Sequence, residues 1–432
     1  MKTPPIQQKQ AAAPQQEQSG QESEGKSLTP PAFQLKASEA GAASGGNAAQ
    51  LKSAGPQGGG QGPIQRAGQV YKINNKQAAL RGGAPDFKSL GKYIPKGTAV
   101  EILEEQSTDK DTFVRVKNVD SGAELGWTKK ENVTGIQEHY KAAKASYTYH
   151  IGGYDLLVYV PKGIETATNP NIFLFFHGNG GDYSLDKKHT PGTYEFPDNP
   201  ALSANMNDAV ANSGSIAICP QGKNVPSMSN EWGGISADVF KTIVDQTLTQ
   251  LSGDLGRADK PLKSGSVSVA GHSAGGAALG KAALGTGATD VTLQDAGYNF
   301  GNSWKSLREW FFAGAESKTV RVITRPNADD THTLIDSGGY FDKSQIIAYG
   351  NTIKQKVTVE EFKGDGKTVE DGGIKLVRGF RVYRKDGSLM GSLRYYQRTS
   401  GDHWAASSGT MATSMTSGKK DKEADTNAPR KK

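Results

Sequence analysis

Residues 266–276 read SVSVAGHSAGG. The first five residues have the alternation of a strand, and the small residues that follow Gly275 are typical of the first turns of a closely packed helix. Between them, Gly271-His272-Ser273-Ala274-Gly275 fits G-x-S-x-G, a sharp strand-to-helix turn that exposes a serine oxygen. Glycine is needed two residues before and after the serine, because a Cβ atom would clash there. The stretch therefore predicts Ser273 as a nucleophile, with the N-terminus of the next helix directed at it.

The residues around this turn alternate between strand and helix patterns. A hairpin is predicted from 147–151 and 156–160, and continuous apolar runs predict strands at 172–176, 215–219, 266–270, 291–294 and 320–324. Helix patterns separate them at 237–252, 274–284, 303–313 and 333–349. Fully apolar strands joined by helices predict an α/β fold, a mostly parallel sheet with helices on both faces. In such a sheet the chemistry lies at the carboxyl ends of the strands.

A second motif follows the apolar run at 172–176. His177-Gly178-Asn179-Gly180-Gly181 is a glycine-rich loop at the end of that predicted strand. Acyl transfer needs two backbone N–H donors for the developing oxyanion, one from the residue after the nucleophile and one from a loop after an earlier strand. The sequence predicts Ala274 as the first donor and Asn179 or Gly180 as the second.

Together, the two motifs resemble the α/β-hydrolase superfamily, specifically its serine esterases and lipases. The resemblance covers residues 147–405, within a predicted domain at 145–405. It implies a triad in the chain order Ser–acid–His, with Ser273 as the nucleophile. The implied reaction is hydrolysis of a carboxylic ester, in a small molecule or a lipid, through an acyl-enzyme, with no metal and no cofactor.

The implied base is a histidine near the end of this domain. The chain has seven histidines, and the expected order leaves His332 and His403. His403 stands in Ser400-Gly401-Asp402-His403-Trp404, in a loop after the strand-like run 393–397, which is the usual place of the base in such folds. We predict His403 as the base and keep His332 in reserve.

The implied acid has two candidates. Asp295 ends the strand-like run 291–294, and Asp330 lies in the loop after the run 320–324. The family more often uses the second position, but residues 292–298 resemble a subgroup in which an Asp-Ala-x-Tyr turn follows the strand after the nucleophile. We predict Asp295, with Asp330 as the alternative. Its task is to orient the imidazole and stabilise the imidazolium.

Residues 65–136 predict a separate small all-β domain. Short alternating runs punctuated by Gly82-Gly83 and Pro95-Lys96-Gly97 indicate a small barrel. The stretch resembles a bacterial SH3 domain, in the segments 79–82, 94–98, 113–116 and 126–128. The resemblance implies a cell-wall ligand or packing against a partner domain. The alternative is a spacer without a ligand.

The two ends of the chain are predicted to be disordered. Residues 1–64 form a leader rich in Gln, Gly and Pro, and residues 409–432 form a basic tail, so neither holds enough apolar residues to offset its ordering entropy. Phe33-Gln34-Leu35-Lys36 and similar pieces resemble leader regions of cargo proteins of bacterial contractile injection systems. That resemblance implies an injection-particle partner for 1–64 and a delivered effector or toxin.

Composition excludes several classes of protein. The net charge is +7, of which the tail carries +3 and residues 1–64 carry +1, so the rest has too small an excess to argue for nucleic acid. No apolar run approaches the roughly 18 residues of a transmembrane helix. The single cysteine, Cys219, excludes an intramolecular disulfide and a cysteine-based zinc site.

The N-terminus has no apolar core of a signal peptide. We therefore expect synthesis in the bacterial cytoplasm and export, if any, by a leaderless route or a particle.

Two other functions remain open from the sequence. The first is a non-catalytic binding or delivery protein on a hydrolase fold. The second is a cell-wall amide or peptide hydrolase that keeps the triad, which the SH3-like segment favours. An ester-versus-amide panel separates the second from an esterase.

Overall fold

The computed structural model describes one compact unit within Ile64–Lys432. The residues it describes are 69–75, 77–136, 145–178, 200–222, 232, 235–296, 302–326, 343–401, 406, 409–415 and 421. The predicted leader at 1–64 lies outside them.

The described chain begins with an all-β domain, which we call the β-domain. It is one antiparallel sheet in the order β3-β2-β6-β5-β4-β1-β7. Inward-facing residues such as Ile73, Val100 and Val114 form its core, and Phe87 stacks on Phe113 at 4.2 Å between ring centroids. The strands are β1 (Val70–Ile73), β2 (Ala78–Arg81), β3 (Ser89–Ile94), β4 (Ala99–Ser107), β5 (Thr112–Asn118), β6 (Glu124–Lys129) and β7 (Val133–Gly135), with the 3-10 helix η1 (Lys130–Asn132) before β7.

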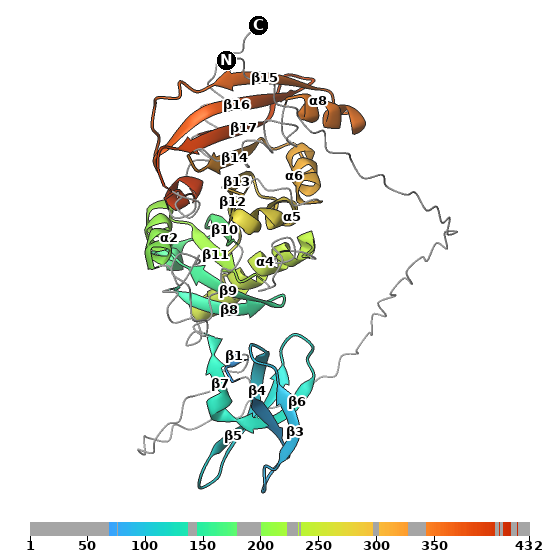
Figure 1. Ribbon diagram of the computed structural model, residues 1–432, viewed down its shortest axis with the longest axis vertical. Helices are drawn as coiled ribbons and strands as arrows, with labels where there is room; N and C mark the ends of the chain where they lie inside the picture. Colours follow the sequence, from blue (N-terminus) through green and yellow to red (C-terminus); the bar gives the residue numbers. More distant parts are fainter. Residues whose placement is uncertain are drawn as a thin grey trace, which may run out of the picture. The chain divides into compact units, whose positions relative to one another are not determined.

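The second sheet has ten strands in the order β15-β16-β17-β14-β13-β12-β10-β11-β9-β8 (Figure 1). They are β8 (Tyr147–Ile151), β9 (Tyr154–Tyr159), β10 (Ile172–Phe176), β11 (Ile216–Pro220), β12 (Val267–His272), β13 (Asp290–Gln294), β14 (Lys318–Thr324), β15 (Val357–Lys363), β16 (Ile374–Arg384) and β17 (Leu389–Arg398).

This sheet is mixed, whereas the sequence predicts a mostly parallel one. The five central pairs, from β17–β14 to β10–β11, are parallel. The four outer pairs are antiparallel. The difference arises at the two edges, where tight turns join β8 to β9 and β16 to β17, because a short turn can join only antiparallel neighbours.

Helices cover both faces of the sheet (Figure 1). Along β10, Ile172, Leu174 and Phe176 point to one face, and Phe173 and Phe175 to the other. The first face packs on α4 (Ala237–Asp254), α5 (Gly276–Thr286) and α6 (Asn302–Phe312), and the second on α2 (Pro200–Ser213). The described part of the chain also contains α8 (Lys343–Thr352), η3 (Ile164–Thr166) and η4 (Ser273–Gly275).

In the C-terminal segment, the described residues 409–415 and 421 differ from the solvated tail that the sequence predicts. Thr410, Met411 and Ser414 are buried. The buried Gln294 amide donates to Thr410 Oγ1 at 3.2 Å and to Ser414 Oγ at 2.8 Å. Asp421 Oδ2 accepts from Arg321 Nε at 2.6 Å. The described residues of this segment satisfy polar groups that the sheet would otherwise bury without partners.

Among the helices of the described ranges, none is long and apolar enough to cross a membrane.

Candidate functional site

The candidate site lies between two neighbouring strands, β10 and β12, whose following strands in the sequence are added on opposite sides of the sheet. From β10 the chain passes through α2 to β11 on one side, whereas from β12 it passes through α5 to β13 on the other. A crevice at the carboxyl ends of two such strands is the general binding place in open α/β sheets. The two predicted motifs begin at these two ends, and Phe176 and Gly271 are paired across them.

The turn after β12 has the close packing that its glycines predict. A Cβ atom on Gly275 would lie 2.2 Å from the carbonyl oxygen of Phe176 and 2.8 Å from that of His177. A Cβ atom on Gly271 would lie 2.7 Å from the carbonyl carbon and oxygen of Gly275. Both substitutions are sterically forbidden without movement of the backbone. The glycines therefore let the serine turn press directly against the end of β10.

Ser273 stands at the apex of this turn with φ at 48°. Serine rarely adopts positive φ, and such strained residues cluster at functional sites. Ser273 and Ala274 open η4, which leads directly into α5. The first N–H groups of a helix have no partner within it and carry a partial positive charge. The local structure thus directs donors toward the carboxyl end of β12.

His177 is held in place by several hydrogen bonds. Its Nε2 accepts from the Gly222 N–H at 2.8 Å, so the ring proton lies on Nδ1, which donates to the Gly178 carbonyl at 2.7 Å. The His177 carbonyl accepts from the Trp232 indole at 3.1 Å. These contacts suit a residue that fixes the start of the glycine-rich loop rather than a base. Sequence reasoning missed Gly222 and Trp232, because nothing in their local pattern indicates this contact.

Asp295 directly follows β13, the neighbour of the strand β12 that Ser273 follows. His272 and Gln294 are register partners, so Ser273 and Asp295 each follow a paired residue on neighbouring strands. Asp295 is buried, has φ at 45° and donates its N–H to the Ile323 carbonyl at 2.7 Å. Its Oδ2 lies 3.6 Å from Nε of Arg325, a partner that the sequence did not predict. The carboxylate is thus fixed at the same edge of the sheet as the serine.

Cys219 is not a second nucleophile at this edge. It lies near the end of β11 and is fully buried, and burial raises the pKa of its thiol well above the ordinary value. The thiol therefore stays protonated and unreactive near neutral pH.

Several predicted site residues lie outside the described part of the chain. They are Asn179, Gly180, Asp330, His332 and His403. The structure therefore places the turn that holds Ser273 and Ala274 against the end of β10 and His177, with Asp295 directly after the adjacent strand. The roles of the others stay predictions. Within the described ranges, no group of three or more His, Cys, Asp or Glu side chains is placed to hold a metal ion.

The β-domain is similar to a known family of domains. Residues 61–134 match the sequence model of the GW (Gly-Tryp) dipeptide domain, in keeping with the SH3-like resemblance. The dipeptide is Gly126-Trp127 in this chain. Gly126 has φ at 118°, which favours glycine, and Trp127 is buried edge-on to Phe87 at 5.1 Å between ring centroids.

Solved structures similar to this chain include two esterases. An acetyl xylan esterase from Aspergillus awamori is 12% identical, covers 58% of this chain and 92% of its own, and has a TM-score of 0.32. Esterase 2 from Thermogutta terrifontis in its apo form is 15% identical, covers 49% of this chain and 92% of its own, and has a TM-score of 0.25. Similarity at this level establishes no function for the chain. No curated protein matches it.

Proposed function

We propose that residues 145–405 form an α/β-hydrolase that cleaves a carboxylic ester with Ser273 as its nucleophile. The observation that carries the proposal is the strained serine turn. Ser273 has positive φ, and the two flanking glycines have no space for a side chain. Both features are what a nucleophile at a strand-to-helix turn requires. The turn also packs against the start of a glycine-rich loop, where the second oxyanion donor is expected.

The proposed reaction has two steps. His403 takes the proton of Ser273 as the serine oxygen attacks the ester carbonyl, and Asp295 orients and stabilises the imidazolium. The N–H groups of Ala274 and of Asn179 or Gly180 hold the oxyanion. The alcohol leaves with the proton from His403. Water activated by His403 then hydrolyses the acyl-enzyme and releases the acid.

The test is hydrolysis of p-nitrophenyl esters of increasing acyl length, compared with the matching anilides. We expect ester cleavage by the wild type and a loss of about 10⁶ in turnover for Ser273→Ala. Ser264→Ala, at an exposed serine before β12, is the matched control and should keep full activity. Cleavage of the anilides at a comparable rate would favour an amide hydrolase. Ester cleavage that persists in Ser273→Ala would refute the proposal.

The identity of the acid has its own test. Asp295→Asn should reduce turnover by about 10⁴, as expected when the acid that sets the imidazole tautomer is lost. Asp330→Asn should leave most of the activity. The reverse result would assign the role to Asp330.

For the β-domain we propose a cell-wall ligand, on the strength of the match to the GW domain. A wall-directed enzyme would act on esters or amides close to that ligand. Sedimentation of the full chain with purified cell walls tests this. Binding without any hydrolysis would favour the non-catalytic binding protein.

A further inference from the structure

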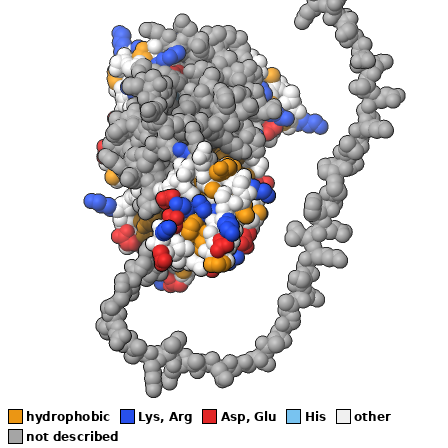
Figure 2. All heavy atoms as spheres, turned by 60° about the horizontal axis from the view of Figure 1, so that its bottom comes forward, with side chains coloured by type: hydrophobic (Ala, Val, Ile, Leu, Met, Phe, Trp, Pro, Cys, Tyr) orange, Lys and Arg blue, Asp and Glu red, His pale blue; other side chains and the backbone are white. Residues whose placement is uncertain are grey.

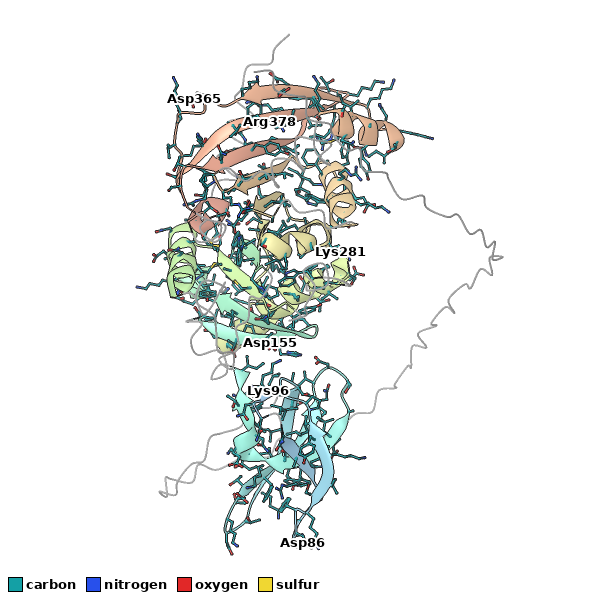
Figure 3. All side chains as sticks on the ribbon, in the orientation of Figure 1. Asp86, Lys96, Asp155, Lys281, Asp365 and Arg378 are labelled. Atoms are coloured by element: carbon teal, nitrogen blue, oxygen red, sulfur yellow. The ribbon has the colours of Figure 1, made fainter. Side chains whose placement is uncertain are left out.

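A buried group of charges joins the β-domain to the larger sheet. Asp155, on β9 (labelled in Figure 3), accepts from Lys72 of β1 at 2.7 Å. Its other carboxylate oxygen lies 2.7 Å from Nδ1 of His150 on β8. Nε2 of His150 in turn lies 2.6 Å from Oδ1 of Asp120, in the turn between β5 and β6. We call Lys72, Asp120, His150 and Asp155 the junction cluster.

Three members of the junction cluster, Lys72, His150 and Asp155, are largely buried, unlike the other described ion pairs of the β-domain, and Asp120 is half exposed. The side chains of Asp155 and His150 are each 4% exposed and that of Lys72 is 12% exposed. By contrast, the pair Lys88–Asp86 is 83% and 61% exposed. Figure 2 shows acidic, basic and apolar side chains interspersed on the described surface near the β-domain. Surface pairs of this kind contribute little, whereas loss of one partner from a buried pair leaves an uncompensated charge.

The charges balance when His150 is protonated, because two cations then face two carboxylates. Burial opposes the charge on His150, but its hydrogen bonds to Asp155 and Asp120 outweigh burial and raise its pKa. Burial likewise opposes the charge on Asp155, but His150 and Lys72 outweigh it and lower the pKa of that carboxyl to about 2.

A chain of hydrogen bonds, one between main-chain groups and two that involve the His177 imidazole, connects the junction cluster to the candidate site. The carbonyl of Asp155 accepts from the N–H of Gln221 at 2.8 Å. The next N–H, of Gly222, donates to Nε2 of His177 at 2.8 Å. His177 then donates to the carbonyl of Gly178, the first glycine of the loop. Gln221, Gly222 and His177 thus link Asp155 to Gly178.

We propose that the β-domain is a positioning part of the hydrolytic site. Lys72 and Asp120 fix Asp155 and His150, which set the position of Gln221 and Gly222, and these hold His177 and the start of the glycine-rich loop. The inference rests on the proposed function only in treating that loop as an oxyanion donor. Lys72 and Asp120 are positioning residues and contact no substrate.

The experiment uses the full chain with Lys72→Met and Asp120→Asn. Lys88→Met, at an exposed lysine of the same domain, is the matched control. Asp120 is half exposed, so we expect Asp120→Asn to fold even if Lys72→Met does not. One readout is hydrogen exchange at the amides of Gln221 and Gly222. The other is kcat and KM for p-nitrophenyl acetate.

We expect both variants to speed exchange at these amides and to lower kcat by about 2- to 30-fold, the range of couplings carried through such networks. KM should change little, because an oxyanion donor acts mainly in the transition state. The control should match the wild type in both readouts.

Exchange rates equal to those of Lys88→Met would overturn the coupling. Faster exchange with unchanged kcat would overturn the positioning role. If the wild type hydrolyses no ester, the proposed function fails, and hydrogen exchange still decides whether the β-domain controls the loop.

Discussion

Ser273 and Asp295 share an unusual backbone state. Among the described residues, four that are not glycine have positive φ, and these two stand at the carboxyl ends of adjacent strands. Positive φ costs a non-glycine residue about 1–3 kcal/mol, so the surrounding structure must hold it. For Ser273 that support is the contact of Gly275 with the end of β10.

Gly275→Ala tests this support. Its new Cβ would overlap the Phe176 carbonyl, so we expect a lower melting temperature, from a cost of at least about 1–3 kcal/mol, and a loss of esterase activity. Gly253→Ala is the control, since that glycine lies in α4 with open space around its Cα. It should unfold at an equal or higher temperature, because alanine favours a helix by about 0.5–1 kcal/mol. Equal behaviour of the two variants in calorimetry would contradict the packing described.

At the scale of elements, the hairpin β8–β9 contains a titratable residue, His150, whose imidazole contacts two carboxylates. The pKa of His150 is raised above its ordinary 6.5, so protonated His150 stabilises the folded state. This contribution is complete below about pH 6.5 and is lost as the pH rises through the raised value. We expect the melting temperature of the wild type to exceed that of His150→Gln, and the difference to shrink with rising pH. Each kcal/mol of unfolding free energy corresponds to about 2–4 °C in melting temperature. A margin that is constant or that grows with pH would show that His150 is not charged in the fold.

In the C-terminal segment, Asp421 forms ion pairs with buried arginines of the sheet. Asp421 neutralises the buried Arg321 and lies 3.6 Å from Nε of Arg394. Asp421→Asn should lower the free energy of unfolding in urea by about 3 kcal/mol, because it leaves buried guanidinium charge uncompensated. Asp259→Asn, at an exposed aspartate, should have almost no effect. A stable Asp421→Asn would mean that the segment is not part of the fold.

These elements show what the sequence can and cannot predict. The apolar runs of β10 and β11 identify buried strands, because every residue in them faces a core. The glycines at 271 and 275 indicate the serine turn, since the clash that they avoid is local. The burial of Ser414 depends on Gln294, 120 residues away, and the position of His177 depends on Gly222, 45 residues away. Such contacts leave no periodic pattern in the sequence. The sequence therefore predicts neither the burial of Ser414 nor the hydrogen bond that holds His177.

For the whole molecule, the described contacts define the part of the chain that folds together. Ile64–Lys432 is one compact unit that contains both the β-domain and the larger sheet. A variant that begins at Ile64 should therefore melt at the same temperature as the full chain and keep its esterase rate. A fall in either, with a circular dichroism spectrum otherwise unchanged, would show that earlier residues contribute to the fold or the site.

The central claim is that Ser273 is an activated nucleophile, and covalent labelling tests it most directly. The full chain and Ser273→Ala are treated with a fluorophosphonate, and the intact masses are measured. We expect one adduct on the wild type, mapped to Ser273, and none on the variant. A folded wild type that takes no adduct, or a variant that is labelled equally, would contradict it.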